Sequence, residues 1–240
     1  MTGVSAPALI QRLCPGQPAV PKAAGGGLEA QLVHALAATG ERFIDVAAPY
    51  GDRVRWVCHR LPAVDALELE ADGADLCVVS PSYVWPPGPP MARALRQVAS
   101  LGRPVLIAPV GQMRVGVSRV ALLWDDSAAC RRAMLDALPF LTRAEETLVV
   151  RFCARADLPR AERRLDQVCA GLAARGVVAK PLIQPQDAGI GELTADLATR
   201  RELDLVVAGA FGSPPLRRTL SGSHTLDLIN ASVAPLLLSR

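Results

Sequence analysis

The chain has 240 residues, half of them apolar, and a net charge of +3 from 26 basic and 23 acidic residues. This length allows one large domain or two small ones, and the apolar content is sufficient for a sizeable core. The basic residues form no block and aromatic residues make up only 4% of the chain, so the composition argues against nucleic-acid binding.

The cysteines and the apolar runs indicate the setting in which the protein works. None of the six cysteines has CxxC spacing, and several fall within apolar patterns, which is typical of free thiols in a reducing cytoplasm. No apolar run approaches the ~18 residues needed to cross a bilayer. The N-terminus also lacks the pattern of a signal peptide. We therefore expect a soluble, cytoplasmic protein without a membrane partner.

The first half of the chain predicts short strands that alternate with helices. Residues 1–27 contain four prolines and end in three glycines, which favours a flexible link with a weak strand pattern at Ala8–Cys14. The elements expected after it are a helix at 28–38, a strand at 54–59, a helix at 63–71, a strand at 75–80, a helix at 91–101 and a strand at 104–108. This alternation is typical of a parallel sheet.

The second half predicts a fuller series of the same kind after a linker at 112–118. Ser127 is the expected N-cap of the first helix, and the helix at 158–175 is clearly amphipathic. Strands are expected at 119–124, 147–152, 177–182, 205–209 and 235–239, and helices at 127–141, 158–175, 192–200 and 223–231. The order is a strand and a helix in alternation, with a strand at each end.

A glycine-rich segment follows the strand at 205–209. Its spacing is Gly209, two residues, Gly212, nine residues and Gly222-Ser223, and a helix comes next. A glycine loop between a strand and a helix leaves backbone N–H groups free to hold an anion. A tight turn that leads into a helix is the simpler interpretation of the same pattern.

Residues 75–109 and 204–239 resemble each other. Both open with Asp-Leu and a Val-Val pair, and both end in a short strand after a proline, Pro104 or Pro235. The first stretch lacks the glycine spacing. We therefore predict two tandem copies of one fold, a degenerate domain at 1–112 and a complete domain at 117–240, with one ligand site per chain.

The glycine segment, the Asp125-Asp126-Ser127 turn and the final Ala234-Pro235 strand together resemble the universal stress protein family in its tandem form. The resemblance covers 117–240 well and 54–110 weakly. It implies an α/β fold of the adenine-nucleotide α-hydrolase-like type, an open parallel sheet of five strands in the order 3-2-1-4-5 with helices on both faces. In such a sheet, ligands bind where the strand order reverses.

The resemblance also implies ATP as the ligand, with Mg²⁺, and no robust catalysis beyond slow ATP hydrolysis. Asp125 would face the ribose or a metal-linked phosphate, and Phe152 would lie where the backbone contacts adenine. The remaining expected ligand contacts lie in or just after the glycine segment: Gly209, Gly212, Arg217, Arg218, Gly222, Ser223 and Thr225. The terminal strands, 104–108 and 235–239, are expected to pair either within the chain, as a pseudo-dimer, or between two chains.

Other functions stay open at this stage. The fold could serve as an interaction scaffold that binds no nucleotide, and Pro214-Pro215 within the glycine segment departs from the polar residues usual in the family. A ligase or transferase of the wider class would need further catalytic residues, and none is evident. His224 follows Ser223, but neighbouring helix residues do not face each other, and no Walker lysine motif is present.

Overall fold

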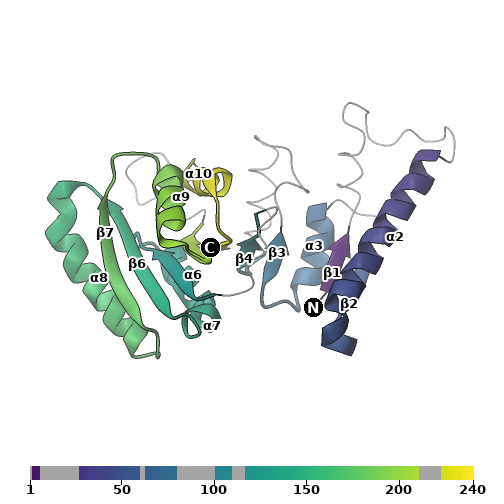
Figure 1. Ribbon diagram of the computed structural model, residues 1–240, viewed down its shortest axis with the longest axis horizontal. Coiled ribbons are helices and arrows are strands. Elements are labelled where there is room, and N and C mark those ends of the chain that lie inside the picture. Colours follow the sequence, from purple (N-terminus) through teal and green to yellow (C-terminus); the bar gives the residue numbers. More distant parts are fainter. Residues whose placement is uncertain (1, 6–26, 60–62, 80–100, 110–116, 211–222) are drawn as a thin grey trace. The chain divides into compact units, whose positions relative to one another are not determined.

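The computed structural model describes residues 2–5, 27–59, 63–79, 101–109, 117–210 and 223–240 (Figure 1). They belong to two compact units, Met1–Ala74 and Asp75–Arg240. The strand expected at 8–14 lies outside the described residues, as does nearly all of the helix expected at 91–101.

The N-terminal unit contains two parallel strands, β1 (Thr2–Ser5) and β2 (Arg55–Cys58). Its other elements are α2 (Gly27–Ala47), the 3-10 helix η1 (Ala48–Arg53) and α3 (Ala63–Ala71). Helix α2 runs well past the expected end at Ala38. It continues through Gly40, where a side chain would meet the Trp56 ring, and Phe43 packs on the same ring with centroids 5.3 Å apart. β1 was not predicted from the sequence.

The C-terminal unit contains one sheet of seven strands in the order β3-β4-β9-β8-β5-β6-β7. Neighbours among β5 to β9 are all parallel. Numbered along the chain, these five strands have the predicted order 3-2-1-4-5, but the sheet contains seven strands and not the five predicted. Their bounds are β5 (Arg119–Leu123), β6 (Glu146–Cys153), β7 (Ala179–Pro185), β8 (Leu205–Gly209) and β9 (Leu236–Ser239).

Two strands from the first half of the chain extend this sheet. β4 (Val105–Ile107) pairs with β9 in antiparallel orientation, with Leu106 opposite Leu237, and β3 (Cys77–Val79) pairs with β4 in parallel. The two terminal strands of the sequence analysis therefore pair within the chain. For the same reason the boundary between the compact units falls at 74/75 and not at the linker predicted at 112–118. That 1–112 is a degenerate copy of the second domain stays a prediction.

Helices cover both faces of the five-stranded part. Val120 and Leu122 of β5 pack with buried residues of α6 (Ala128–Asp136) and α8 (Leu158–Ala173). Leu123, which points to the other face, lies near α9 (Ile190–Arg201) and α10 (Ser223–Ala231). The helix expected at 127–141 is interrupted at Ala137, and a separate short helix, α7 (Leu138–Leu141), follows with Pro139 in its first turn, where proline is tolerated. A second 3-10 turn, η2 (Arg155–Asp157), precedes α8.

The remaining helix bounds agree closely with the sequence analysis, and β8 and α10 have the expected limits. None of the helices among the described residues combines the length and apolar character needed to cross a bilayer.

Candidate functional site

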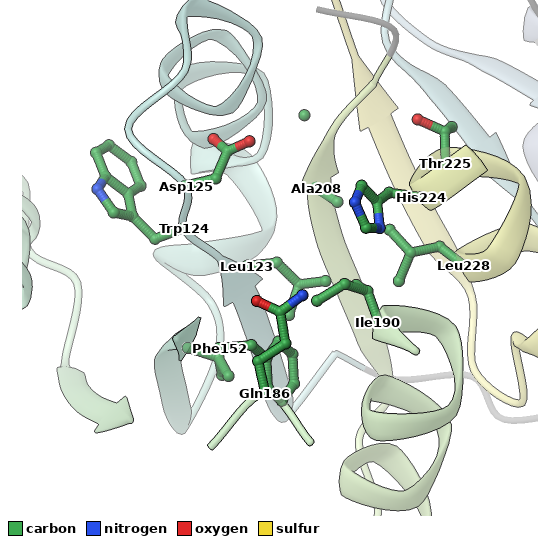
Figure 2. A pocket seen from close by; sticks show the side chains of 12 residues that line it. Leu123, Trp124, Asp125, Phe152, Gln186, Ile190, Ala208, His224, Thr225 and Leu228 are labelled. Atoms are coloured by element: carbon green, nitrogen blue, oxygen red, sulfur yellow. The ribbon is translucent and has the colours of Figure 1, made fainter. Parts of the chain in front are cut away.

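A cavity of about 230 Å³ lies at the carboxyl ends of β5, β6 and β8, with α9 and α10 along its other side (Figure 2). β5 and β8 are the adjacent strands from which the chain continues in opposite directions across the sheet. This is the switch point at which open α/β sheets bind ligands. The lining residues are Leu123, Trp124, Asp125, Val150, Phe152, Gln186, Ile190, Ala208, Gly209, His224, Thr225 and Leu228.

The cavity brings together four of the residues predicted from the sequence: Asp125, Phe152, Gly209 and Thr225. They come from the end of β5, from β6, from the end of β8 and from α10. Ser223 is the first residue of α10. The other predicted residues, Gly212, Arg217, Arg218 and Gly222, lie outside the described residues, together with Pro214-Pro215.

The Asp125 carboxylate is oriented by its own turn. Its Oδ1 accepts a hydrogen bond from the Ser127 N–H at 2.9 Å, and Ser127 in turn caps α6 by accepting from the Cys130 N–H at 3.0 Å. Oδ2 makes no hydrogen bond to the described part of the chain. The carboxylate is exposed and can accept a further hydrogen bond or contact a cation.

No group of three potential metal-ligating side chains occurs among the described residues. Mg²⁺ commonly binds one or two carboxylates and completes its octahedron with water and substrate phosphates. A single carboxylate such as Asp125 therefore fits a Mg²⁺ ion that arrives with a phosphate ligand, but not a metal held by protein groups alone.

Gly209 has a packing role that the sequence analysis did not anticipate. A Cβ atom at Gly209 would lie 2.5 Å from the Cys130 nitrogen and 2.8 Å from the Ala129 carbonyl carbon. A side chain there would collide with the backbone at the start of α6. The glycine allows the first turn of α6 to pack directly against the end of β8, beside the cavity.

The N-terminal end of α10 forms the opposite wall. His224 and Thr225 lie in its first turn and line the cavity, and Thr225 is only 3% exposed. The first turn of a helix has N–H groups without intrahelical partners and a partial positive charge. This wall is therefore suited to an anion or another hydrogen-bond acceptor.

The floor of the cavity is apolar. Leu123, Val150 and Phe152 come from the sheet, and Ile190 and Leu228 from the helices. Two polar side chains that the sequence analysis did not assign, Gln186 and His224, also face the cavity (Figure 2). Gln186 follows the last residue of β7, so its position at a strand end was the signal that could have identified it.

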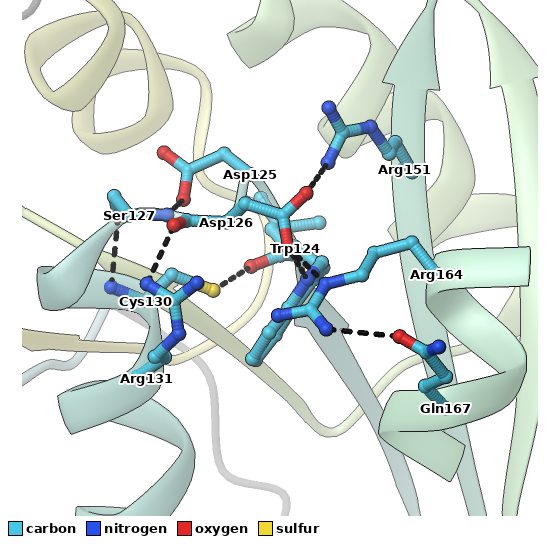
Figure 3. A network of polar contacts seen from close by, with 10 residues as sticks. Trp124, Asp125, Asp126, Ser127, Cys130, Arg131, Arg151, Arg164 and Gln167 are labelled. Atoms are coloured by element: carbon cyan, nitrogen blue, oxygen red, sulfur yellow. Dashed lines mark hydrogen bonds and ion pairs between the residues drawn. The ribbon is translucent and has the colours of Figure 1, made fainter. Parts of the chain in front are cut away.

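Asp126 holds the β5–α6 turn in place (Figure 3). Its backbone φ of 65° lies in the left-handed region, which is costly for most residues other than glycine. Its carboxylate accepts from Trp124 Nε1 at 3.0 Å, Arg151 at 2.8 Å and Arg164 Nε at 2.5 Å. The turn that presents Asp125 is thereby tied to β6 and α8.

These contacts change the acidity of Asp126. Partial burial alone would raise the pKa of its carboxyl group, but the hydrogen bonds from Arg164 and Trp124 and the charges of Arg151 and Arg164 outweigh this effect. The pKa of Asp126 is therefore lowered from its ordinary value, and the ionised form is the one that holds the turn. From the sequence, Asp126 was expected only as part of the Asp125-Asp126-Ser127 turn, without a role of its own.

Cys130 is a packed thiol and no reactive group. Burial raises its pKa to about 12, and its sulfur donates to the carbonyl oxygen of Leu123 at 3.1 Å. A thiol with so high a pKa is not ionised near neutral pH and is a poor nucleophile.

No protein-family model and no curated protein matches the sequence, but solved structures do. A universal stress protein from Archaeoglobus fulgidus DSM 4304 aligns with 91% of this chain and 80% of its own, at 12% identity and a TM-score of 0.68. A candidate universal stress protein from Pseudomonas aeruginosa UCBPP-PA14 covers 99% of this chain and 91% of its own, at 13% identity and a TM-score of 0.57. A universal stress protein solved in complex with cAMP aligns with 52% of this chain and 98% of its own, at 17% identity and a TM-score of 0.42.

The two long alignments show that the chain has the α/β fold of the universal stress proteins, as the sequence predicted. At these identities the likeness concerns the fold. What the cavity binds depends on this chain's own residues.

Proposed function

We propose that this chain is a regulatory protein that binds ATP, with Mg²⁺, in the cavity at the switch point of the C-terminal unit. The observation that carries the proposal is the composition of this one cavity. It combines an apolar floor, the exposed Asp125 carboxylate, the end of β8 at Gly209 and the N-terminal end of α10. An adenine nucleotide needs three kinds of surface. Its base needs an apolar surface, its sugar or metal-bound phosphates need a carboxylate, and its anionic tail needs hydrogen-bond donors.

Each wall has a role in this proposal. The base lies on the floor formed by Leu123, Val150 and Phe152, where burial of its flat apolar faces is favourable. The phosphates lie at the first turn of α10, where free N–H groups and the helix dipole attract an anion. Arg217 and Arg218 of the glycine segment are proposed to reach the same phosphates through bidentate hydrogen bonds.

Asp125 is proposed to act on the sugar or, through Mg²⁺, on the phosphates. The Ser127 N–H fixes the orientation of its Oδ1, so a ligand meets a carboxylate that needs little reorganisation. When bound, Mg²⁺ would neutralise phosphate charge. The chain's own residues would position the nucleotide, and the Walker lysine motif that contacts the phosphates in P-loop ATPases is absent from the sequence. The proposed output is a change in conformation or partner binding upon nucleotide binding.

Isothermal titration of the purified full-length chain with ATP and Mg²⁺ tests the proposal. Gly222→Asp, which places a negative charge beside the proposed phosphate site, should abolish binding. Asp125→Asn should weaken Mg²⁺-ATP binding by roughly tenfold, the effect of a charge-assisted contact. Asp166→Asn is the matched control, since it removes the same charge from an exposed position on α8. Unchanged affinity in Gly222→Asp and Asp125→Asn, or no binding by the unmodified chain at millimolar ATP, would contradict the proposal.

A further inference from the structure

His224 occupies a distinct position in the cavity. It is the second residue of α10, and its ring projects into the space between Ala208 and Leu228 (Figure 2). Its Nδ1 is buried and has no hydrogen-bond partner among the described residues. Buried polar atoms normally have a partner. The lack of a partner at Nδ1 therefore bears on which of the two ring nitrogens carries the proton.

The missing partner favours one tautomer. A neutral imidazole has one N–H donor and one bare acceptor nitrogen, and an orphaned buried N–H is rarer in folded proteins than an acceptor that lacks part of its hydrogen bonding. The proton therefore belongs on Nε2. Because Nδ1 is buried, the group that His224 can offer to a ligand is an Nε2–H donor.

An acceptor lies on the other side of the cavity. Asp125, at the end of β5, faces the cavity from the side opposite α10 (Figure 2). Its Oδ1 already accepts from Ser127, and an ionised carboxylate has no proton to donate. A ligand group placed between these two walls meets an acceptor at Asp125 and a donor at His224.

Ribose hydroxyls match this pair. Each hydroxyl donates one hydrogen bond and accepts others, so one hydroxyl of a vicinal diol can donate to Asp125 while the diol accepts from His224. A phosphate would meet the Asp125 carboxylate only through a cation, and the backbone N–H groups of the first turn of α10 suit it better than the single Nε2–H donor of His224. The base is not expected between these two side chains, because its flat faces are proposed to lie on the apolar floor of the cavity.

We propose that His224, facing Asp125 across the cavity, is a specificity-determining residue that donates to a ribose hydroxyl and makes the site select ribonucleotides over deoxyribonucleotides. This inference rests on the proposed nucleotide site and adds a selectivity that nucleotide binding alone does not require. His224 contributes binding energy through its Nε2 alone. A side chain that places a donor at the same point therefore replaces it.

The test compares ATP with 2′-deoxyATP and 3′-deoxyATP, each titrated with Mg²⁺ into the unmodified chain, His224→Gln and His224→Leu. The amide nitrogen of Gln can occupy the position of Nε2, whereas Leu fills similar space without a donor. The unmodified chain should bind ATP roughly 3- to 10-fold more tightly than the deoxy analogue that lacks the hydroxyl contacted by His224, the effect of one neutral hydrogen bond. His224→Gln should retain the ratios for both analogues, and His224→Leu should lower the ratio for at least one of them by roughly 3- to 10-fold. Any preference that comes from the contact of Asp125 with a ribose hydroxyl persists in all three chains.

The deoxy analogues also report on folding. A correctly folded His224→Leu chain binds the analogue that lacks the His224 contact as tightly as the unmodified chain does, because that contact is already absent. Equal binding of ATP and both analogues by the unmodified chain, or ratios for both analogues that are unchanged in His224→Leu, would overturn the inference and leave the proposed function intact. Failure of the unmodified chain to bind ATP would overturn both.

Discussion

Arg164 Nε donates to Oδ1 of Asp126 at 2.5 Å, which links helix α8 to the β5–α6 turn across 38 positions of the chain. Arg151 of β6 donates to the other oxygen of the same carboxylate at 2.8 Å. Asp126 meanwhile adopts the left-handed conformation, with φ of 65°. The side-chain contacts therefore offset a backbone cost, and the turn they stabilise also sets the direction of Asp125 on one side and Ser127 on the other.

Replacement of Asp126 should separate these two effects. Asp126→Ala loses the three side-chain contacts and leaves a Cβ at positive φ, so we expect the free energy of unfolding to fall by roughly 1–3 kcal/mol. Asp126→Gly loses the same contacts but accepts the backbone conformation, and should be more stable than the Ala variant by about 1 kcal/mol. Urea denaturation of both variants measures the difference. An Ala variant as stable as the Gly variant would show that the turn carries no backbone cost.

The lowered pKa of Asp126 predicts a dependence of stability on pH. A carboxyl group whose pKa is lower in the folded state than the unfolded value of about 3.9 stabilises the fold above that value, and the contribution is lost as pH falls through the folded pKa. The stability difference between the unmodified chain and Asp126→Asn should thus be full near pH 6 and shrink below about pH 4. Urea denaturation from pH 6 to pH 3 measures it. A difference that stays constant over this range would mean that another group holds the turn.

Gly209→Ala should destabilise the C-terminal unit. Its Cβ would meet the backbone of Ala129 and Cys130 at less than 3 Å, and neither α6 nor β8 can move without disturbing the core, so we expect a loss of roughly 1–3 kcal/mol. Gly171→Ala is the matched control, because nothing lies within 4 Å of its Cβ and it sits inside α8. That variant should gain about 0.5–1 kcal/mol, since alanine is the better helix former. Thermal or urea denaturation of the two variants side by side tests both signs.

Much of this fold could be predicted because its signals are local. The apolar runs at β5, β6 and β8, and the spacing of Ala161, Leu165, Val168 and Leu172 in α8, identify strands and helices from neighbouring residues alone. The reversal of strand order followed from the resemblance and was confirmed by the pairing of β5 with both β6 and β8. The position of Asp125 was predicted from the same resemblance, because the carboxyl ends of adjacent parallel strands lie at the same edge of the sheet.

The features that were missed depend on distant contacts. The sequence indicates only that Asp126 belongs to a polar turn. Its role depends on ion pairs with Arg151 of β6 and Arg164 of α8, which are distant in the sequence. The orientation of His224 depends on the packing of α10 against α9, which directs the imidazole ring toward the cavity. The addition of β3 and β4 to the sheet likewise results from an antiparallel pairing of β4 with β9, and apolar periodicity in either strand does not specify its partner.

Gly191 provides the last test, because it sets how closely α9 and α10 approach. A Cβ atom at Gly191 would lie 2.3 Å from the carbonyl oxygen of Asp227 and 3.1 Å from the Cβ of Ala231. Both of these atoms belong to α10, which also carries His224 and Thr225 into the cavity. Gly191→Ala should therefore push α10 away from α9 and displace the wall that the proposed nucleotide site requires.

We expect Gly191→Ala to lower the free energy of unfolding by roughly 1–3 kcal/mol and to weaken ATP binding even at temperatures where the chain is fully folded. Gly171→Ala, on the far side of the sheet from α10, should leave the affinity unchanged. Titration at low temperature, with circular dichroism to verify folding, separates the loss of affinity from the loss of stability. A folded Gly191→Ala chain with undiminished affinity would show that the position of α10 does not control the site, and the assignment of its first turn to the ligand would be wrong.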